Sequence, residues 1–375
     1  MELEQMRTWA EIDLGNLEHN YRALRACAPD SKFLGVVKAN AYGHGAIPVA
    51  RRLEELGADY LAVACLNEGL ELRQAGIKMP ILVLGTTPPE FAEQVVAADL
   101  TQAVFTPELA RALSDAAGKL GTTAKAHIKM DTGMSRLGLL CHDPKGAAKE
   151  AAALCALPHL EHEGVFTHFA NADGDEDYTM LQFTRFLDVL DELEKSYGVT
   201  FKIRHCAASA AVLNYPCTHM DMVRPGIALY GHYPDPSCEG LDGPGLLPLM
   251  TLKSRVAAVR DLPAGTPVSY GCTASFADGG GRVAVLPIGY ADGLHRLLSN
   301  EGSVWLAGQT RPIMGRVCMD MCMVGLDDGA EVRPGDVAEV FGPHMPVECL
   351  ADRAGTVQYE LLCAVSPRVP RIYLG

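Results

Sequence analysis

The chain has 375 residues, 48% of them hydrophobic, so it can bury a large core and is long enough for two domains. Its formal net charge is −14 and its 32 lysines and arginines are scattered, which argues against nucleic acid as a partner. The N-terminal stretch is acidic and lacks the apolar core of a signal peptide, and no apolar stretch reaches the roughly 18 residues that span a membrane. The 12 cysteines include no C-x-x-C pair, so we expect reduced thiols and a cytoplasmic protein.

The part of the chain before about residue 235 alternates short apolar runs with helix-like stretches. The apolar runs lie at 33–38, 60–64, 81–85, 101–105, 124–130, 164–169, 201–206 and 221–231. Between them, stretches such as 180–198 carry apolar residues at helical spacing. Eight strands with helical crossovers in this length predict a (β/α)8 barrel of the TIM-like type, with an open doubly wound sheet as the alternative.

The pattern changes after Pro234. Residues 234–245 are rich in proline and glycine and predict a linker. Beyond them, β-rich runs separated by glycine-containing turns predict a mostly antiparallel β domain; they lie at 252–259, 282–290, 302–308, 321–326 and 336–342. We therefore expect a barrel domain at 1–235, with residues 1–12 able to pack with the β domain, and a β domain at 236–375.

The first apolar run ends on Lys38 and is followed by a loop that contains Tyr42, Gly43 and His44. A lysine at the end of a buried strand is unfavourable unless its ammonium is used or its pKa is lowered. A lysine with a lowered pKa can condense with an aldehyde, so Lys38 is a candidate for a Schiff base with pyridoxal phosphate. A strand that simply ends at a solvated lysine is the alternative.

Further unusual polar residues lie where other predicted strands end. They are Lys129, Asp131 and Arg136 around the fifth strand, His168 after the sixth, Ser209 after the seventh, and Arg224, Gly226 and Ile227 in the eighth. Each alone has an ordinary structural explanation, but their recurrence at strand ends favours a shared site. Loops after the seventh and eighth strands of such barrels often bind phosphate, which predicts that role for Ser209, Gly226 and Ile227.

Arg224 indicates the type of chemistry. A pyridoxal phosphate enzyme needs a group opposite the pyridine nitrogen. An always cationic arginine keeps that nitrogen unprotonated, which favours restrained proton transfer over decarboxylation or transamination. No metal site is expected: the HEG at 162–164 has no P-C-x-x-C after it, and Cys318 and Cys322 have no companions at ligand spacing.

Eight motifs resemble those of the alanine racemase family. They are VVKANAYGHG (36–45), HIKMDTGMSRLG (127–138), THFANAD (167–173), VRPGIALYG (223–231), VSYGCTASF (268–276), LPIGYADG (286–293), GRVCMDM (315–321) and YELLCAVSPRVPRIY (359–373). The resemblance extends in order from Trp9 to Tyr373. It implies a pyridoxal phosphate enzyme that interconverts L- and D-alanine, supplies D-alanine for peptidoglycan, and works as a homodimer whose active sites are shared between subunits.

The resemblance also implies roles for single residues. Lys38 holds the cofactor and exchanges the α-proton on the D face, and Tyr270 of the other subunit does so on the L face, since racemisation needs an acid/base on each side. His168 and Arg224 support Tyr270, whose ordinary pKa of about 10 is too high for a base at neutral pH. The residues that match the phosphate site are Tyr42, Ser209, Gly226, Ile227 and Tyr359.

Substrate contacts follow from the same resemblance. Arg136 matches a residue that binds the phenolic oxygen of the cofactor and the substrate carboxylate, and Met319 supplies a backbone contact to that carboxylate. Lys129 matches a position that is carbamylated in some members. Asp173, Tyr290 and Arg316 match the lining of an access channel, where Leu294 and His295 depart from the usual pattern.

Three other functions stay open on the sequence. A racemase of the same fold could act mainly on serine or another amino acid. A decarboxylase is disfavoured by Tyr270 and Arg224. A non-catalytic carrier of pyridoxal phosphate would share the barrel and its lysine, but such carriers resemble the barrel alone.

Overall fold

The computed structural model describes residues 5–240, 243–277 and 279–375. Residues 1–4 of the N-terminal segment and 241–242 of the predicted linker lie outside the described residues. The chain forms two compact units. The barrel unit contains Leu17–Ala41 and Ala46–Leu247, and so continues past residue 235. The β unit contains the residues up to Asn16, Tyr42–Gly45 and Pro248–Gly375.

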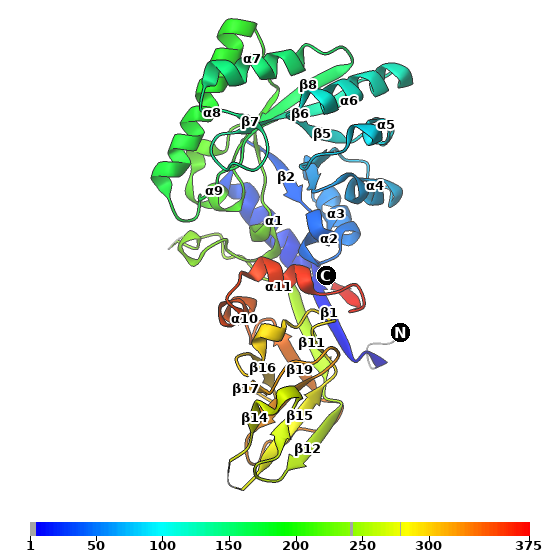
Figure 1. Cartoon of the computed structure of the whole chain (residues 1–375), viewed down its shortest axis with the longest axis vertical. Coiled ribbons are helices and arrows are strands. Elements are labelled where there is room, and N and C mark those ends of the chain that lie inside the picture. Colours follow the sequence, from blue (N-terminus) through cyan, green and yellow to red (C-terminus); the bar gives the residue numbers. More distant parts are fainter. Residues whose placement is uncertain (1–4, 241–242, 278) are drawn as a thin grey trace. The chain divides into compact units, whose positions relative to one another are not determined.

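The barrel unit is built on eight parallel strands, which confirms the predicted architecture (Figure 1). In spatial order they are β10 (Met222–Val223), β2 (Lys32–Val36), β3 (Tyr60–Val63), β4 (Ile81–Val83), β5 (Thr101–Val104), β6 (Ala124–Asp131), β8 (Leu160–Phe166) and β9 (Ile203–His205). A parallel bridge between Ala208 and Arg224 joins the ends of β9 and β10. The sheet therefore returns on itself, which excludes the open doubly wound alternative.

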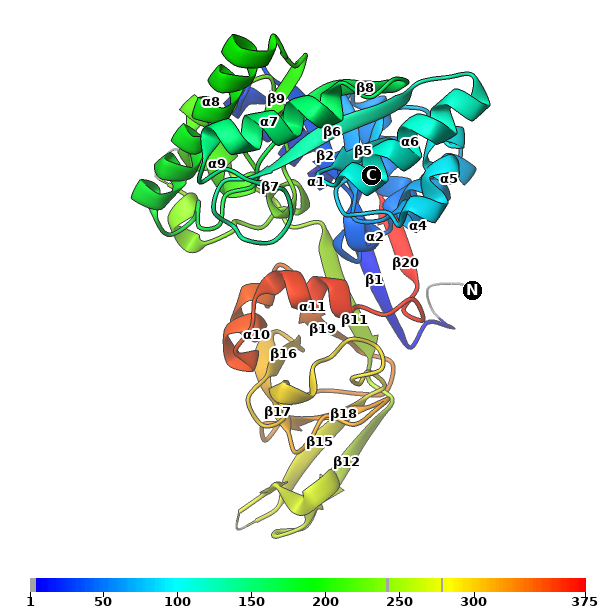
Figure 2. The same ribbon diagram turned by 45° about the horizontal axis from the view of Figure 1, so that its top comes forward.

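The strands are short apolar runs because both of their faces are covered. All residues of β3, β4 and β5 are buried, as expected for a parallel sheet with helices outside and packed side chains inside. The helices are α1 (Leu14–Cys27), α3 (Ala46–Glu55), α4 (Leu66–Gln74), α5 (Ala92–Ala97), α6 (Pro107–Leu120), α7 (Pro144–Cys155), α8 (Glu176–Tyr197) and α9 (Ser209–Asn214). Figure 2 shows α6 beside β6, which also pairs with the short β7 (Leu139–Leu140).

The eighth strand is shorter than the sequence predicts. The expected strand covers 221–231, but β10 ends at Val223 and residues Ile227–Tyr230 form a 3₁₀ turn. Pro225 has no N–H to continue the ladder, so the chain must leave the sheet here. The first strand likewise ends at Val36, two residues before Lys38.

The β unit is organised around β1 (Thr8–Asp13), which pairs antiparallel with β11 (Met250–Arg255) and parallel with β20 (Arg371–Leu374). The remaining elements are β12 (Ala258–Leu262), β13 (Pro267–Val268), β14 (Ala274–Ser275), β15 (Gly281–Leu286), β16 (Ser303–Leu306), β17 (Gln309–Met314), β18 (Cys322–Leu326), β19 (Val337–Phe341), α10 (Val347–Ala354) and α11 (Gln358–Ala364). Apart from β1 and β20, the named strand pairs of this unit are antiparallel, as predicted. The run expected as one strand at 252–259 is divided between β11 and β12. Among the residues that the structure describes, no helix is both long and apolar enough to cross a lipid bilayer.

Candidate active site

The segment after β2 is a left-handed turn that carries the half-buried Lys38. Ala39, Asn40 and Ala41 all have positive φ, between 53° and 54°. Each such non-glycine residue costs about 1–2 kcal/mol, so other contacts must hold the turn. The amide of Ala39 donates to Oε1 of Glu68 at 2.7 Å, and Oδ1 of Asn40 accepts from the amide of Ala46 at 2.8 Å. The turn therefore places Lys38 at a fixed point past the carboxyl end of β2.

Arg224 is the buried cation at the end of β10, with 3% of its surface exposed. Its Nη2 donates to the carbonyls of Thr167 at 2.8 Å and Cys206 at 3.0 Å and lies 3.3 Å from Nδ1 of His168, while Nη1 lies 3.0 Å from Nδ1 of His205. Burial lowers the pKa of Arg224 to about 10, which leaves it charged at neutral pH. A cation is thus held by neutral acceptors from the ends of two neighbouring strands, β8 and β9.

Lys129 on β6 lies near this cation and is 7% exposed. Its Nζ is 4.5 Å from the ring centre of Phe166, and the guanidinium carbon of Arg224 is 5.5 Å from the same centre. Burial, and then the charges of Arg224 and Arg136, lower the pKa of Lys129 well below its usual value. Burial followed by Arg224 and Lys129 also lowers the pKa of His168. Both shifts favour the neutral forms of Lys129 and His168 beside a permanent cation.

Arg136 is exposed on a loop that Asp131 organises. Oδ1 of Asp131 accepts from the amides of residues 133, 134 and 135, each at 3.0 Å, and Oδ2 accepts from the amide of Arg136 at 3.0 Å. One carboxylate therefore fixes the backbone amides of four consecutive residues, 133 to 136. This role of Asp131 was not predicted from the sequence, although an Asp-Thr-Gly turn sequence was the available signal.

Ser209 and Gly226 come together, as predicted for the loops after the last two strands. Ser209 is the first residue of α9, and its buried Oγ accepts from the amide of Gly226 at 2.9 Å and of Ala228 at 3.3 Å. Ile227 opens the 3₁₀ turn directly after Gly226. The hydroxyl and the two amide groups form a compact polar corner at the carboxyl ends of the strands.

Tyr42 and Tyr359 belong to the β unit, where their ring centres are 6.2 Å apart. Burial, and then Tyr359, raises the pKa of Tyr42, so its hydroxyl stays protonated. Both phenols can donate a hydrogen bond to an anion. Their proximity agrees with a shared task, which the sequence analysis expected to be phosphate binding.

A second group of predicted residues lies on neighbouring loops of the β unit. Tyr270 begins a short 3₁₀ turn and is 71% exposed. The preceding Ser269 donates from Oγ to the carbonyl of Arg316 at 2.6 Å. The amide of Tyr290 donates to the carbonyl of Cys318 at 3.0 Å, next to Met319. These contacts bring the loops of Tyr270, Tyr290, Arg316 and Met319 into one network, whereas Asp173 belongs to the barrel unit.

Leu294 and His295 depart from the family pattern in different ways. Leu294 is 3% exposed and packs in the interior of the β unit, so its side chain does not line an open channel there. His295 is partly exposed and precedes the 3₁₀ turn Arg296–Leu298. The difference from the family pattern at Leu294 therefore affects the packed interior of the β unit.

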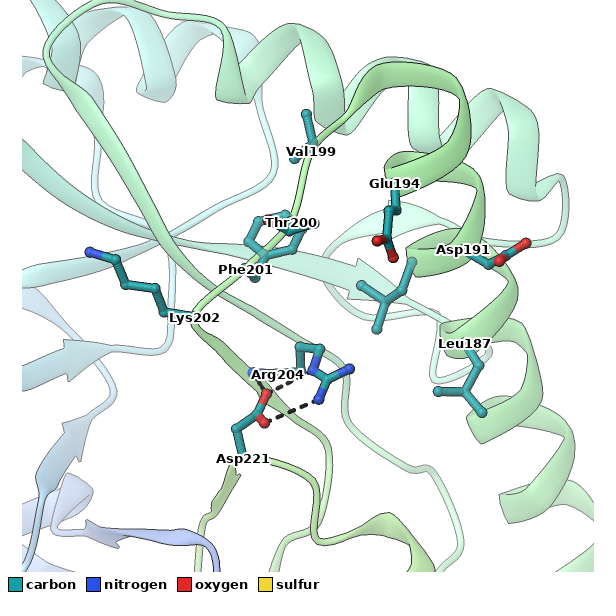
Figure 3. Close-up of a pocket in the computed structure, with 10 residues that line it drawn as sticks. Leu187, Asp191, Glu194, Val199, Thr200, Phe201, Lys202, Arg204 and Asp221 are labelled. Atoms are coloured by element: carbon teal, nitrogen blue, oxygen red, sulfur yellow. Dashed lines mark hydrogen bonds and ion pairs between the residues drawn. The ribbon is translucent and has the colours of Figure 1, made fainter.

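One pocket of the barrel unit lies away from all predicted site residues (Figure 3). It is lined by residues of α8 and β9, among them Glu194 and Arg204, and by Asp221 before β10. Arg204 and Asp221 form an ion pair of 2.8 Å at its wall, which satisfies both charges. Within the described parts of the chain, no group of three or more His, Cys, Asp or Glu side chains is arranged to hold a metal ion.

Comparisons with known proteins cover almost the whole chain. Residues 12–234 match the family described as alanine racemase, N-terminal domain, and residues 249–373 match alanine racemase, C-terminal domain. The alanine racemase of Desulforamulus reducens is 47% identical over 372 residues, which is 98% of this chain and 99% of that protein. The alanine racemase of Desulfovibrio desulfuricans is 45% identical over 370 residues, 98% of each chain.

Solved structures agree with the sequence comparisons. The alanine racemase of Clostridium difficile 630 superposes with a TM-score of 0.94 at 40% identity, covering 99% of this chain and 96% of that chain. The alanine racemase of Bacillus anthracis with bound L-Ala-P superposes with a TM-score of 0.91 at 36% identity, covering 98% and 95%.

Proposed function

We propose, from the premise that this chain belongs to the alanine racemase family, that Lys38 and Tyr270 exchange the α-proton of alanine from opposite faces. Membership of the family makes the chain a pyridoxal-phosphate-dependent isomerase that interconverts L- and D-alanine. The observation that carries these residue roles is Arg224, a buried cation whose hydrogen-bond partners among the described residues are two carbonyls and two imidazoles.

The donor groups of the barrel unit fit the cofactor of this family. An amine at Lys38 suits an aldehyde, the polar corner of Ser209 and Gly226 suits a phosphate, and a cation at Arg224 suits an unprotonated pyridine nitrogen. Ile227, Tyr42 and Tyr359 complete the proposed phosphate site. When bound, pyridoxal phosphate withdraws electrons from the Cα–H bond of the amino acid. The permanent charge of Arg224 limits this withdrawal, which favours proton exchange over loss of the carboxylate.

Two proton-exchanging groups are needed because one group returns the proton to the face from which it came. We assign the D face to the amine of Lys38 and the L face to the hydroxyl of Tyr270. A tyrosine hydroxyl is a weak base, so the second role requires hydrogen-bond donors near its oxygen. The neutral His168 beside Arg224 is suited to this task, with Tyr270 supplied by the other subunit of a homodimer.

The remaining residues bind and orient the substrate. Arg136, on its fixed loop, is proposed to bind the carboxylate together with the backbone of Met319. Lys129 is proposed to be carbamylated, because a buried neutral amine can react with carbon dioxide, and the new negative charge would orient Arg136. Asp173, Tyr290 and Arg316 are proposed to line the access channel of a cytoplasmic homodimer.

Alanine turnover in deuterated water tests the proposal directly. We expect purified protein with pyridoxal phosphate to introduce deuterium at Cα of both enantiomers from L-alanine. Faster exchange of serine in a panel of amino acids would favour a racemase of other specificity. Bound cofactor absorbance with exchange in neither enantiomer would refute the function and leave a carrier of pyridoxal phosphate.

A further inference from the structure

A chain of polar side chains runs through the barrel interior from Arg224 to Glu163. Nδ1 of His205 lies 3.0 Å from Nη1 of Arg224, and Nε2 of His205 lies 2.9 Å from Nδ1 of His127. Nε2 of His127 faces Oε2 of Glu163 at 3.7 Å. Both histidines are 0% exposed. The chain crosses β9, β6 and β8 and contains groups that the proposed function does not use.

The hydrogen-bond donors and acceptors available on each side chain fix the direction of the hydrogen bonds from Arg224 to His127. A guanidinium only donates, so Nδ1 of His205 accepts and its proton must be on Nε2. That Nε2–H donates to Nδ1 of His127, which places the proton of His127 on Nε2, toward Glu163. Burial lowers the pKa of both imidazoles, so each is neutral and carries a single ring proton. The order of donors and acceptors therefore ends on the Nε2–H of His127, a buried donor that has no hydrogen-bond partner among the described residues and faces Glu163 at 3.7 Å.

The backbone is shaped to aim Glu163 at His127. Ala126 of β6 pairs with His162 and His127 pairs with Gly164, so Glu163 is the extra residue of a β-bulge. Bulges redirect a side chain and are frequent beside active sites. A Cβ on Gly164 would lie 2.7 Å from three atoms of the His127 ring. The bulge and the glycine together make room for the imidazole over β8.

Glu163 is ionised and supplies a negative charge at the far end of this chain of side chains. The imidazole of His127, and then the hydroxyl of Tyr60, which donates to Oε2, hold the pKa of Glu163 at about 2 against the effect of burial. Asp131 is a carboxylate near Lys129, but its two oxygens already accept four backbone amides. An uncompensated buried cation is strongly unfavourable, so a carboxylate connected to Arg224 matters.

We propose that Glu163 is a positioning residue for the racemase reaction, and that it acts through His127 and His205 to hold Arg224 in place. The inference rests on the proposed function, because that function puts Arg224 opposite the pyridine nitrogen. Glu163 supplies the negative charge that balances Arg224. It also orients the rings of His127 and His205, each of which carries its proton on Nε2. A carboxylate at the far end of the barrel interior thereby sets the geometry of a cation at the proposed active site.

Glu163→Gln removes the charge and keeps the shape, and Glu161→Gln is its matched control. Glu161 is on the same strand and forms an exposed ion pair of 2.7 Å with Lys202. We expect Glu163→Gln to lower kcat for alanine about tenfold with KM and cofactor binding nearly unchanged. Glu161→Gln should stay within about twofold, because exposed pairs contribute little.

Nitrogen NMR of histidine-labelled protein supplies a readout that does not depend on turnover. In the unmodified protein we expect His127 and His205 to carry their protons on Nε2. Glu163→Gln should change the His127 resonances and Glu161→Gln should not. Unchanged kcat and unchanged His127 resonances in Glu163→Gln would overturn this proposal while leaving the racemase function intact. Absence of alanine exchange in the unmodified protein would instead refute the function.

Tyr60→Phe is the second variant, for the case that Glu163→Gln does not fold. It removes the hydroxyl that donates to Glu163 and leaves the charge in place. We expect about threefold lower kcat and a shifted His127 resonance, since one hydrogen bond to a charged group is lost. Wild-type kcat with unshifted resonances in this variant would overturn the proposal.

Discussion

Nη2 of Arg224 lies 3.3 Å from Nδ1 of His168. Because the guanidinium cannot accept a hydrogen bond, Nδ1 of His168 is the acceptor and the single proton of the neutral ring is on Nε2. His168 therefore offers one N–H donor, with its orientation set by the cation behind it. Such a donor stabilises an oxyanion better than it stabilises a hydroxyl. This is the property that the proposed mechanism requires beside Tyr270.

Tyr270→Phe tests the second proton-exchanging group. We expect the bound cofactor to keep its absorbance and racemisation to fall by about 10²–10⁴, the usual effect of losing an acid/base group. Exchange should be lost mainly from L-alanine, because Lys38 still serves the D face. Tyr197→Phe, an exposed tyrosine on α8, is the control and should retain full activity. Loss of cofactor absorbance in parallel with activity would show that Tyr270 is a cofactor ligand instead.

The buried histidines predict that acid destabilises the fold. Burial lowers the pKa of His127, His168 and His205 in the folded state. The unfolded chain binds protons below its ordinary histidine pKa of about 6.5 and the folded chain does not, so stability is present above this pH and is lost as the pH falls. Each such imidazole contributes up to about 1.4 kcal/mol per pH unit.

Thermal unfolding between pH 7.5 and 5.5 measures this effect. We expect the melting temperature to fall steadily below about pH 6.5. We expect the slope of the unfolding free energy against pH to be smaller for His205→Gln than for the unmodified protein, by the equivalent of about one bound proton. Parallel curves for the two proteins would mean that His205 is protonated in the folded state as well.

The barrel could be predicted from the sequence because most of its strands are local runs of apolar residues. Residues 60–64 and 81–85 are short and apolar, and they became β3 and β4. The left-handed turn at Ala39 to Ala41 was not predictable, since alanine rarely adopts it and the contact that holds it comes from Glu68 in α4. Local sequence carries no sign of such a distant partner.

At the site, too, features set by the local sequence could be predicted, whereas features that depend on distant parts of the chain could not. Ser209, Arg224 and Gly226 could be predicted because strand ends in a barrel converge by topology. The sequence analysis missed His205, which accepts a hydrogen bond from Arg224, although a histidine inside an apolar strand was a usable signal. It dismissed residues 162–164 as a failed metal motif. Their bulge depends on pairing with β6, which only the folded structure reveals.

Lys129 is expected to form a carbamate. Burial and the nearby charges of Arg224 and Arg136 lower the pKa of Lys129 and so favour its neutral amine, and a neutral amine attacks carbon dioxide to form an N–C bond with release of one proton. Protein equilibrated with ¹³C-bicarbonate should show one carbamate carbon signal by NMR. Lys129→Arg, which cannot react, should abolish it, whereas Lys195→Arg on the surface should not. A signal that survives Lys129→Arg would assign the modification to another amine.

Asp131→Asn should loosen the loop that carries Arg136. The substitution replaces one acceptor oxygen with an NH₂ group, which would face a backbone amide that also donates. We expect unfolding free energy to fall by about 1–3 kcal/mol, the cost of an unsatisfied buried donor. KM for alanine should rise more than kcat falls, because the loop presents Arg136 to the substrate carboxylate.

Asp143→Asn is the matched control for this substitution. Asp143 caps α7 by accepting a hydrogen bond from the amide of Lys145 at 3.2 Å. Its substitution therefore removes a carboxylate from the same stretch of chain and leaves the loop of Arg136 unchanged. Its stability should fall by less than 1 kcal/mol, since asparagine caps a helix about as well as aspartate, and KM should not change. Both variants lose one negative charge. Equal changes of KM in the two variants would therefore show that this loss of charge, and not the loosening of the loop, changes substrate binding. Urea unfolding and steady-state kinetics on both variants separate these outcomes.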